Sequence, residues 1–141
     1  MIFRPIIQYD LYNGYLSLLS QLTNIGSGDF IQKFNEIKNT PNISIIVAYD
    51  ETINKVIGAG TIIIEPKLVH GCSNVGHIED VVVDQNYRSQ KIGQQIINYL
   101  VNMAKVSNCY KVILDCSENN IGFYEKCGFK NTNNQMSLYF S

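Results

Sequence analysis

The pattern of apolar and polar positions predicts that strands and helices follow one another along the chain. Runs rich in β-branched residues over 1–8, 43–49 and 56–64 predict strands. The polar residues 50–55 join the second and third runs, so these two should form a hairpin. Residues 135–140 alternate between apolar and polar positions and predict a final strand.

Two helices are predicted between the first strand and the hairpin. Asp10 can cap the first helix, and Asp29 with Gln32 forms a capping-box pattern at the start of the second. The apolar face of the first helix is Leu11, Tyr15, Leu18, Leu19 and Leu22, and that of the second is Phe30, Phe34 and Ile37. A loop over 23–28 should connect them.

The second half of the chain predicts a strand, a long helix and a strand. Residues 76–84 carry three consecutive valines near their end, which indicates a strand buried on both faces. Apolar residues recur at helical spacing over 92–104, and 110–115 form the next strand. This order makes a right-handed parallel unit. A short helix over 118–126 should end at Gly128.

Length and charge narrow the possible classes of protein. The 141 residues fit a single domain, 1–141. A net charge of -1 argues against nucleic-acid or membrane attraction, because both need a basic excess. The four cysteines include no C-x-x-C pair, so we expect reduced thiols in a cytosolic protein. His70, Cys72 and His77 match no zinc-ligand spacing, so we expect no metal.

The loop before the long helix is a candidate anion site. Arg88 and Lys91 lie next to a helix start, where unpaired N–H groups and the helix dipole favour a negative charge. A pyrophosphate would suit this position. The same two charges could equally be solvated, because many helices begin with a basic turn that contains glycine.

Three acids interrupt the apolar strands. Glu79 and Asp80 are neighbours within one strand, so they should face opposite sides of the sheet. Burying a charged carboxylate in a strand costs folding free energy unless water, a partner group or a ligand contacts it. This end of the strand is therefore either exposed to solvent or part of a cleft. Asp115 lies near the end of the next strand, where ligands gather in open α/β sheets. Together the acids could bind hydroxyls and an ammonium group, and could help to remove a proton.

Tyr124 lies on the predicted short helix. A tyrosine in such a place is usually part of the core. If its hydroxyl is free, the phenol could instead donate to an anion that develops during a reaction.

Together these segments resemble the GNAT superfamily of acetyltransferases, and among its members the enzymes that acetylate glucosamine 6-phosphate. The segments are G-H-I-E-D-V-V-V-D (76–84), Y-R-S-Q-K-I-G (87–93), C-Y-K-V-I-L-D-C (109–116) and N-x-x-F-Y-E-K-C-G-F (120–129). The resemblance implies an α/β (α+β) fold with a mixed central sheet, a splayed pair of parallel strands and helices on both faces.

The resemblance also implies a reaction, in which the sugar amine attacks acetyl-CoA directly and gives the N-acetyl sugar phosphate used for UDP-N-acetylglucosamine. Asp115 would aid deprotonation beside Glu79, and Tyr124 would protonate or stabilise the leaving thiolate. The implied acetyl-CoA-binding residues are Val81, Val82, Val83, Arg88, Ser89, Gln90, Lys91, Ile92, Gly93, Gln94, Asn120, Tyr124 and Lys126. The implied substrate-binding residues are Thr23, Lys67, Leu68, Val69, His70, Glu79, Asp80, Asp115 and Cys116.

Two positions depart from the family pattern. Lys91 stands where the loop usually has a glycine. This departure leaves open the alternative that the protein is a CoA-binding module without catalysis. Tyr139 stands where the last strand usually carries a basic residue for the phosphate, which leaves open another small amine as acceptor. The resemblance further implies an intertwined homodimer, in which the C-terminal strand of one copy completes the partner's site.

Overall fold

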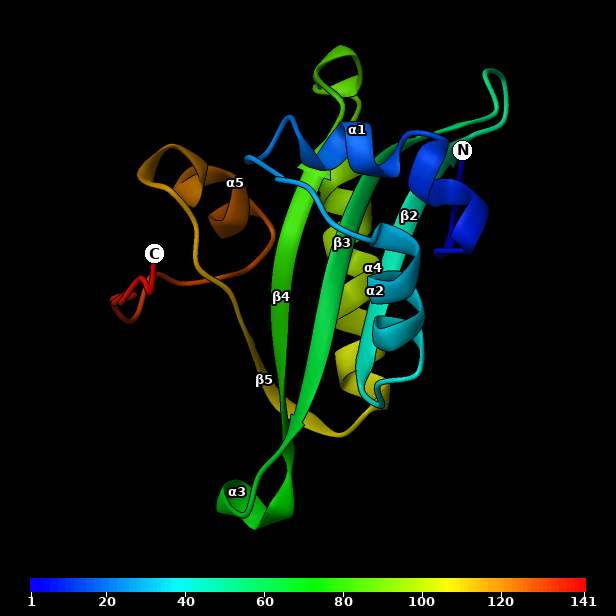
Figure 1. Cartoon of the computed structure of the whole chain (residues 1–141). Helices are drawn as coiled ribbons and strands as arrows, with labels where there is room; N and C mark the ends of the chain where they lie inside the picture. The colour runs from blue at the N-terminus through cyan, green and yellow to red at the C-terminus, as the bar shows by residue number, and fades with distance from the viewer.

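The computed structural model describes residues 1–141 and contains a five-stranded sheet with helices on both faces (Figure 1). The strands lie side by side in chain order, and only the last two are parallel. They are β1 (Ile2–Pro5), β2 (Ile43–Asp50), β3 (Lys55–Pro66), β4 (Asn74–Val83) and β5 (Cys109–Ile113). The predicted mixed α/β architecture is confirmed.

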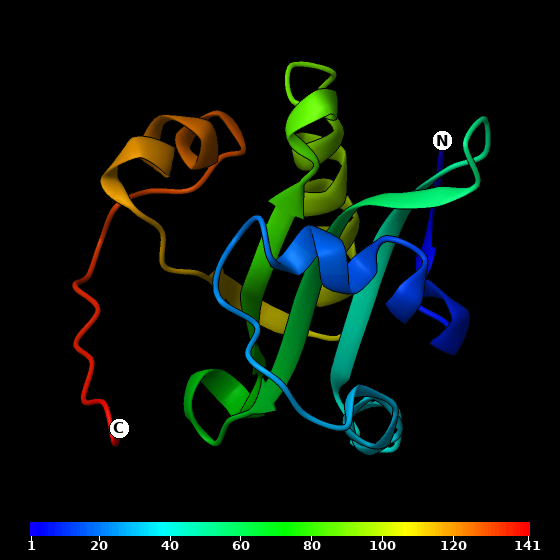
Figure 2. The ribbon, with the colours of Figure 1, turned by 45° about the horizontal axis from the view of Figure 1, so that its top comes forward.

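The long helix α4 (Ile92–Val106) covers one face of the sheet, while α1 (Tyr15–Leu19) and α2 (Phe30–Lys38) cover the other (Figures 1 and 2). The predicted Asp29 cap is present, because its carboxylate accepts from Gln32 N–H at 3.0 Å. The core residues on the α4 side are Ile46, Ala48, Ile57, Ile62, Ile78, Ile92, Ile96, Ile97, Leu100 and Ala104. The shorter helices are α3 (Val69–Cys72) and α5 (Ile121–Lys126), and 3-10 turns lie at Gln8–Tyr12, Gln85–Tyr87 and Glu118–Asn120.

The helix predicted to start at Asp10 is divided, and the prediction that Asp10 caps it is wrong. Residues Gln8–Tyr12 form a 3-10 turn, and α1 starts only after Gly14, whose φ is 112°. The Asp10 carboxylate is fully buried, where it accepts from Arg4 Nη1 at 2.7 Å and Nη2 at 3.0 Å. It also accepts from Ile7 N–H at 2.9 Å. The Asp10 side chain is thus taken up by contacts with Arg4 and Ile7, and the α-helix begins only at Tyr15.

Gly14→Ala is expected to lower the free energy of unfolding by about 3 kcal/mol, or the Tm by about 10 °C. A β-carbon at Gly14 would lie 2.5 Å from the Val56 carbonyl oxygen, and φ at Gly14 is in the left-handed region. Denaturant and thermal unfolding would measure the loss. Gly28→Ala is the matched control, because no atom lies within 4 Å of its added β-carbon. Equal stability of the two variants would contradict this packing.

The parallel strands β4 and β5 separate along their length. Their pairing runs from Asn74 opposite Cys109 to His77 opposite Ile113 and then stops, while β4 continues to Val83. One edge of β4 therefore has no neighbouring strand beyond His77, which is the predicted splay. The sequence pattern placed Asp115 inside β5. This strand ends at Ile113, so Asp115 lies beyond it.

A bulge at Asp80 interrupts β4. Asp80 has φ 51°, and the pairing with β3 shifts so that Thr61 opposes Glu79 while Ala59 opposes Val82. The extra residue breaks the alternation of side chains. The prediction that Glu79 and Asp80 face opposite sides is therefore not met. Both acids are exposed. The prediction that this strand is buried on both faces is therefore wrong at these two residues.

The predicted strand over 135–140 is absent from the single chain. Residues 129–141 have no regular secondary structure and run away from the sheet (Figures 1 and 2). Met136, Leu138, Tyr139 and Phe140 are between 81% and 95% exposed. The reason is that no strand of the same chain lies beside this segment to accept its hydrogen bonds.

Candidate active site

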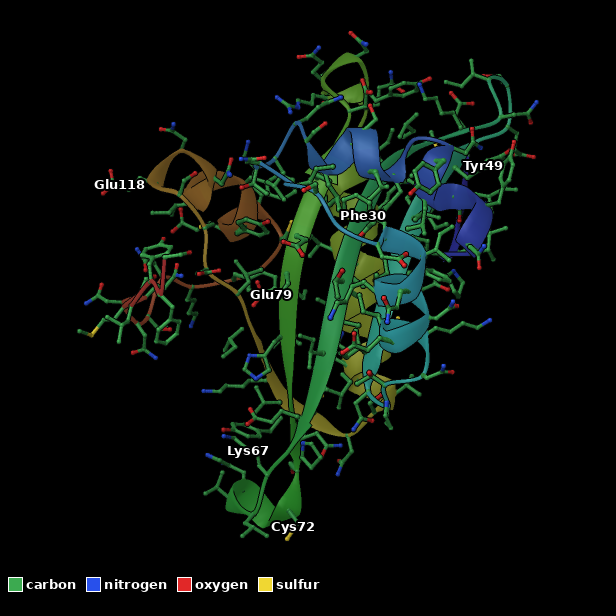
Figure 3. The ribbon with its side chains drawn as sticks, in the orientation of Figure 1. Phe30, Tyr49, Lys67, Cys72, Glu79 and Glu118 are labelled. Atoms are coloured by element: carbon green, nitrogen blue, oxygen red, sulfur yellow. The ribbon has the colours of Figure 1, made fainter.

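A cavity of about 490 Å³ lies beside the separated ends of β4 and β5. Four predicted site residues line it: Glu79 from β4, Asp115 and Cys116 from the segment after β5, and Tyr124 from α5. Figure 3 shows Glu79 on β4 and Glu118 across from it on the segment that leads to α5. The fold thus brings together residues that are up to 45 positions apart, from 79 to 124.

Glu79 has a raised pKa. Partial loss of water around the carboxylate is the main cause, followed by the nearby charges of Asp115 and Asp80, while His77 acts in the opposite direction. A carboxyl group whose ionised form is disfavoured binds a proton more strongly. Glu79 is therefore suited to accept a proton during a reaction.

Tyr124 is held with its phenol in the cavity wall. Its ring makes edge contacts with Phe123 and Phe129, at centroid distances of 4.9 and 6.0 Å. The helix α5 ends at Gly128, whose φ is 97°, and Phe129 N–H donates to the Tyr124 carbonyl at 3.0 Å. Burial, and then nearby Cys116, Cys127 and Asp115, raise the pKa of Tyr124 to about 12. At neutral pH the phenol keeps its proton and can donate it.

The basic loop before α4 has the backbone shape that glycine favours, although it contains no glycine before Gly93. Ser89 has φ 81° and Lys91 has φ 62°, both in the left-handed region. Each such residue costs roughly 1 kcal/mol relative to an ordinary conformation. Lys91 is the residue that precedes α4, so the first N–H groups of the helix lack carbonyl partners within it. Residues 88–91 are exposed, so the loop at which the anion site is predicted is open to solvent.

The basic loop lies next to the open edge of β4 and to α5. Arg88 Nε donates to the Val83 carbonyl at 3.2 Å, which joins the loop to the open edge of β4. A β-carbon on Gly93 would lie 3.1 Å from the ring of Phe123, so α5 packs directly on the start of α4. An extended ligand could therefore run from Glu79 along the edge of Val81–Val83 to the loop.

The other predicted substrate residues do not line the cavity. Lys67, Leu68, Val69 and His70 lie at the tip of the β3–β4 hairpin, where Figure 3 labels Lys67. Lys67 Nζ is 3.6 Å from Glu65 Oε1, and a hydrogen bond of 2.9 Å joins that oxygen to His77 Nε2 in the cavity wall. His77 thus has a hydrogen-bonding role in the cavity wall. The partner Glu65 was not predicted, because finding it requires the register of the hairpin.

Thr23 lies in an exposed loop after α1, outside the cavity. Gln21 holds the start of this loop beside the basic loop. Its side chain accepts from Gln85 N–H at 3.1 Å and donates to Asp84 Oδ2 at 3.3 Å. Neither contact was predicted, since exposed glutamines carry no signal in a single sequence.

Sequence reasoning missed one cationic residue of the cavity wall, Lys111, which lies within a segment that was noted for other reasons. Lys130, a candidate for the positive charge that Tyr139 does not supply, also lines the cavity. No group of three His, Cys, Asp or Glu side chains is arranged to hold a metal ion. None of the helices has the length and apolar character needed to cross a membrane.

A mixed sheet that opens between two parallel strands, with a basic loop and the start of α4 beside the opening, is the architecture that the sequence resemblance implied. The chain belongs to the acetyltransferase (GNAT) family, whose model matches residues 10–129. Enzymes of this family use acetyl-CoA as the acetyl donor.

Several relatives are similar over nearly the whole chain. The glucosamine 6-phosphate N-acetyltransferase 1 of Dictyostelium discoideum is 44% identical, covering 97% of this chain and 89% of the relative. The glucosamine 6-phosphate N-acetyltransferase of Arabidopsis thaliana is 43% identical, covering 93% and 91%. The crystal structure of the Arabidopsis enzyme superposes with a TM-score of 0.95 at 41% identity, covering 99% of this chain and 98% of that one. An acetyltransferase from Trypanosoma brucei gives 0.91 at 34% identity, covering 99% of each chain.

Proposed function

We propose that this protein transfers the acetyl group of acetyl-CoA to the amine of D-glucosamine 6-phosphate, giving N-acetyl-D-glucosamine 6-phosphate for UDP-N-acetylglucosamine biosynthesis. The observation that carries the proposal is the meeting of Glu79, Asp115 and Tyr124 in one cavity. It is supported by relatives named for this reaction, which match more than nine tenths of the chain.

The donor would lie along the open edge of β4. Its pantetheine arm would pair with the backbone of Val81–Val83, and its diphosphate would bind the N–H groups of Arg88–Gln94. A backbone N–H near Val81 would polarise the thioester carbonyl. Asn120, Tyr124 and Lys126, on or next to α5, would contact the coenzyme. The open β4 edge and the unpaired start of α4 support this assignment.

The chemistry would be a direct acyl transfer. The amine nitrogen attacks the thioester carbon, a C–N bond forms and the C–S bond breaks. Glu79 takes the amine proton, and Tyr124 gives its proton to the leaving sulfur and regains one from solvent. We assign the proton to Glu79 and not to Asp115, because partial desolvation of the carboxylate and two neighbouring carboxylates raise the pKa of Glu79.

The acceptor would occupy the rest of the cavity. Asp115 and Cys116 would hold the sugar in the cavity, with Asp80 beside Glu79 on β4. Thr23 and Lys67–His70 lie outside the cavity of the single chain, so their help in binding the phosphate would require the second copy. Lys111 and Lys130 in the cavity wall add positive charge that suits a phosphate. The hydrogen bond from His77 to Glu65 links this wall to Lys67.

Asp115→Asn is expected to move the acidic limb of kcat/KM to lower pH. The base must be ionised to act, so activity rises as pH increases through the pKa of Glu79. Removing the Asp115 charge removes one of the causes that raise this pKa. The ammonium group of the free acceptor titrates independently of the protein, so a shift of the limb reports Glu79. An unmoved limb would exclude Glu79 as the base.

Thiol release tests the function. Pure protein is incubated with acetyl-CoA and glucosamine 6-phosphate, and free CoA is measured, with unphosphorylated glucosamine as the matched acceptor. No release at saturating substrate would reject the proposal. Preference for another amine would indicate an acetyltransferase with a different small amine as acceptor. Tyr139, at a position that is usually basic, motivates this alternative. Acetyl-CoA binding without turnover on any amine would indicate a non-catalytic module.

We also infer that two copies assemble by exchanging their C-terminal segments. The apolar side chains of 136–140 are exposed in the single chain. A second cavity of about 730 Å³, lined mostly by apolar residues of α4, β5 and 127–133, lies at the outer edge of β5. A strand from a partner would cover that edge and bury those side chains.

We place the protein in the cytoplasm. All four cysteines are free, and Cys72 and Cys116 are exposed. Exposed free thiols suit a reducing compartment. Cell fractionation with a specific antibody would test the assignment.

A further inference from the structure

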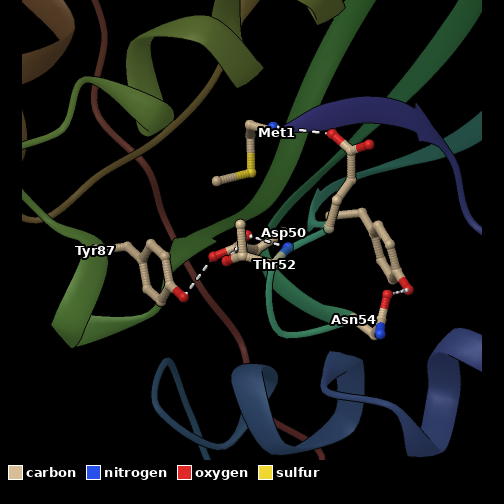
Figure 4. A network of polar contacts seen from close by, with 7 residues as sticks. Met1, Asp50, Thr52, Asn54 and Tyr87 are labelled. Carbon is tan, nitrogen blue, oxygen red and sulfur yellow. Dashed lines mark hydrogen bonds and ion pairs between the residues drawn. The ribbon is translucent and has the colours of Figure 1, made fainter.

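A network of polar contacts supports the basic loop from the side of the β2–β3 turn (Figure 4). Tyr87, the residue before Arg88, donates its hydroxyl to Asp50 Oδ2 at 2.7 Å. Asp50 is the last residue of β2 and lies 37 positions earlier in the chain. The contact therefore ties the loop to a different part of the sheet.

Asp50 is itself fixed in place. Its Oδ1 accepts from Thr52 N–H at 2.9 Å and from the Thr52 hydroxyl at 2.7 Å. The hydrogen bond from Tyr87, and then the two from Thr52, lower the pKa of Asp50. The same contact with Asp50 is the main cause that raises the pKa of Tyr87. At neutral pH a protonated phenol thus donates to an ionised carboxylate, which is a strong type of hydrogen bond.

Tyr87 is well placed to hold the loop. Its ring packs against the core cluster under α4, and its N–H donates to the Asp84 carbonyl at 2.8 Å. The loop that follows contains Ser89 and Lys91 in the left-handed region. Such conformations persist only where surrounding contacts hold them. The Tyr87 anchor supplies such a contact directly at the start of the loop.

We propose that Asp50, acting through Tyr87, is a positioning residue for the coenzyme, and sets how tightly the Arg88–Gln94 loop binds the diphosphate. The inference rests on the donor site proposed above and is independent of which amine is acetylated. Asp50 would touch neither substrate, so its effect would be confined to the affinity for the donor.

Calorimetry of CoA binding tests the inference with Tyr87→Phe, which removes only the hydroxyl. We expect CoA affinity to fall roughly tenfold, the effect of losing one hydrogen bond to a charged group. Asp50→Ala should weaken binding in the same way. Tyr87→Phe introduced into Asp50→Ala should then cause no further loss, because both changes remove one interaction. Asp50→Ala also keeps the test decisive if Tyr87→Phe does not fold.

Two comparisons separate positioning from general stability. Tyr49→Phe is the matched control, because it removes a tyrosine hydroxyl that donates to Asn54 Oδ1 at 3.2 Å in the same turn without touching the loop. Its CoA affinity should equal that of the wild type. Acetyl-pantetheine lacks the diphosphate, so Tyr87→Phe and the wild type should use it with equal kcat/KM on any amine that the wild type acetylates.

Equal CoA affinity of Tyr87→Phe and the wild type would overturn the inference. So would an equal loss with acetyl-pantetheine, which would indicate general damage. If the wild type binds no CoA, the donor site and the inference fail together. If it binds CoA, and the affinity falls as expected, but it does not acetylate glucosamine 6-phosphate, only the acceptor assignment fails.

Discussion

Tyr124→Phe is expected to lower kcat on the order of 100-fold, which is the usual loss when a proton-transferring group is removed. The affinity for acetyl-CoA should stay nearly unchanged. The phenol, with a pKa raised to about 12, holds the proton that the departing thiolate needs. Without it the thiolate must leave as an anion or take a proton from water.

Tyr124→Phe removes only the hydroxyl and keeps the aromatic ring. The Phe123 and Phe129 rings that pack on Tyr124 would contact a phenylalanine equally well, so the fold of α5 should survive. Steady-state kinetics at saturating donor measure kcat, and calorimetry measures donor affinity. Tyr9→Phe is the control, because Tyr9 is 73% exposed and far from the cavity in the chain. An unchanged kcat in Tyr124→Phe would remove Tyr124 from the mechanism.

Deletion of residues 135–141 is expected to convert a dimer into a monomer and to abolish acetylation of the acceptor. The single chain leaves Met136, Leu138, Tyr139 and Phe140 in water, and four such side chains gain much by burial against a partner. Light scattering after gel filtration measures the mass of the particle. Thiol release measures activity.

The same deletion should leave CoA binding intact. The loop before α4 and the open edge of β4 belong to a single chain, so they do not need the partner. Val106→Ser is the control, because Val106 is an apolar residue that is 88% exposed at the end of α4. This substitution should not change the mass of the particle measured by light scattering. A wild type that is already monomeric and fully active would rule out strand exchange.

Much of the fold follows from local patterns. Asp29 with Gln32, the apolar stripe of α4 and the turn at Gly128 each predict an element that the structure contains. These predictions are confirmed because helix caps, helical periodicity and the left-handed residue that ends a helix depend on residues a few positions apart. The hairpin of β2 and β3 was predicted for the same reason.

The differences arise where distant residues meet. Asp10 would cap a helix in isolation, but its pairing with Arg4 in the core overrides that preference. Gly14, in the left-handed region directly before α1, interrupts the predicted helix and lies beside Val56, which is far along the chain. The bulge at Asp80 depends on the register with β3, which the strand pattern of one segment does not encode.

The sequence by itself determined the order of the five strands and of α2, α4 and α5, the family, and the set of residues able to carry acyl transfer, because these depend on residue type and spacing. Only the tertiary structure decided which of them meet. It joined Glu79, Asp115 and Tyr124 in one cavity, and it placed Lys67–His70 outside it. It also raised the pKa of Glu79, because burial and neighbouring charge depend on distances in space and not on positions along the chain.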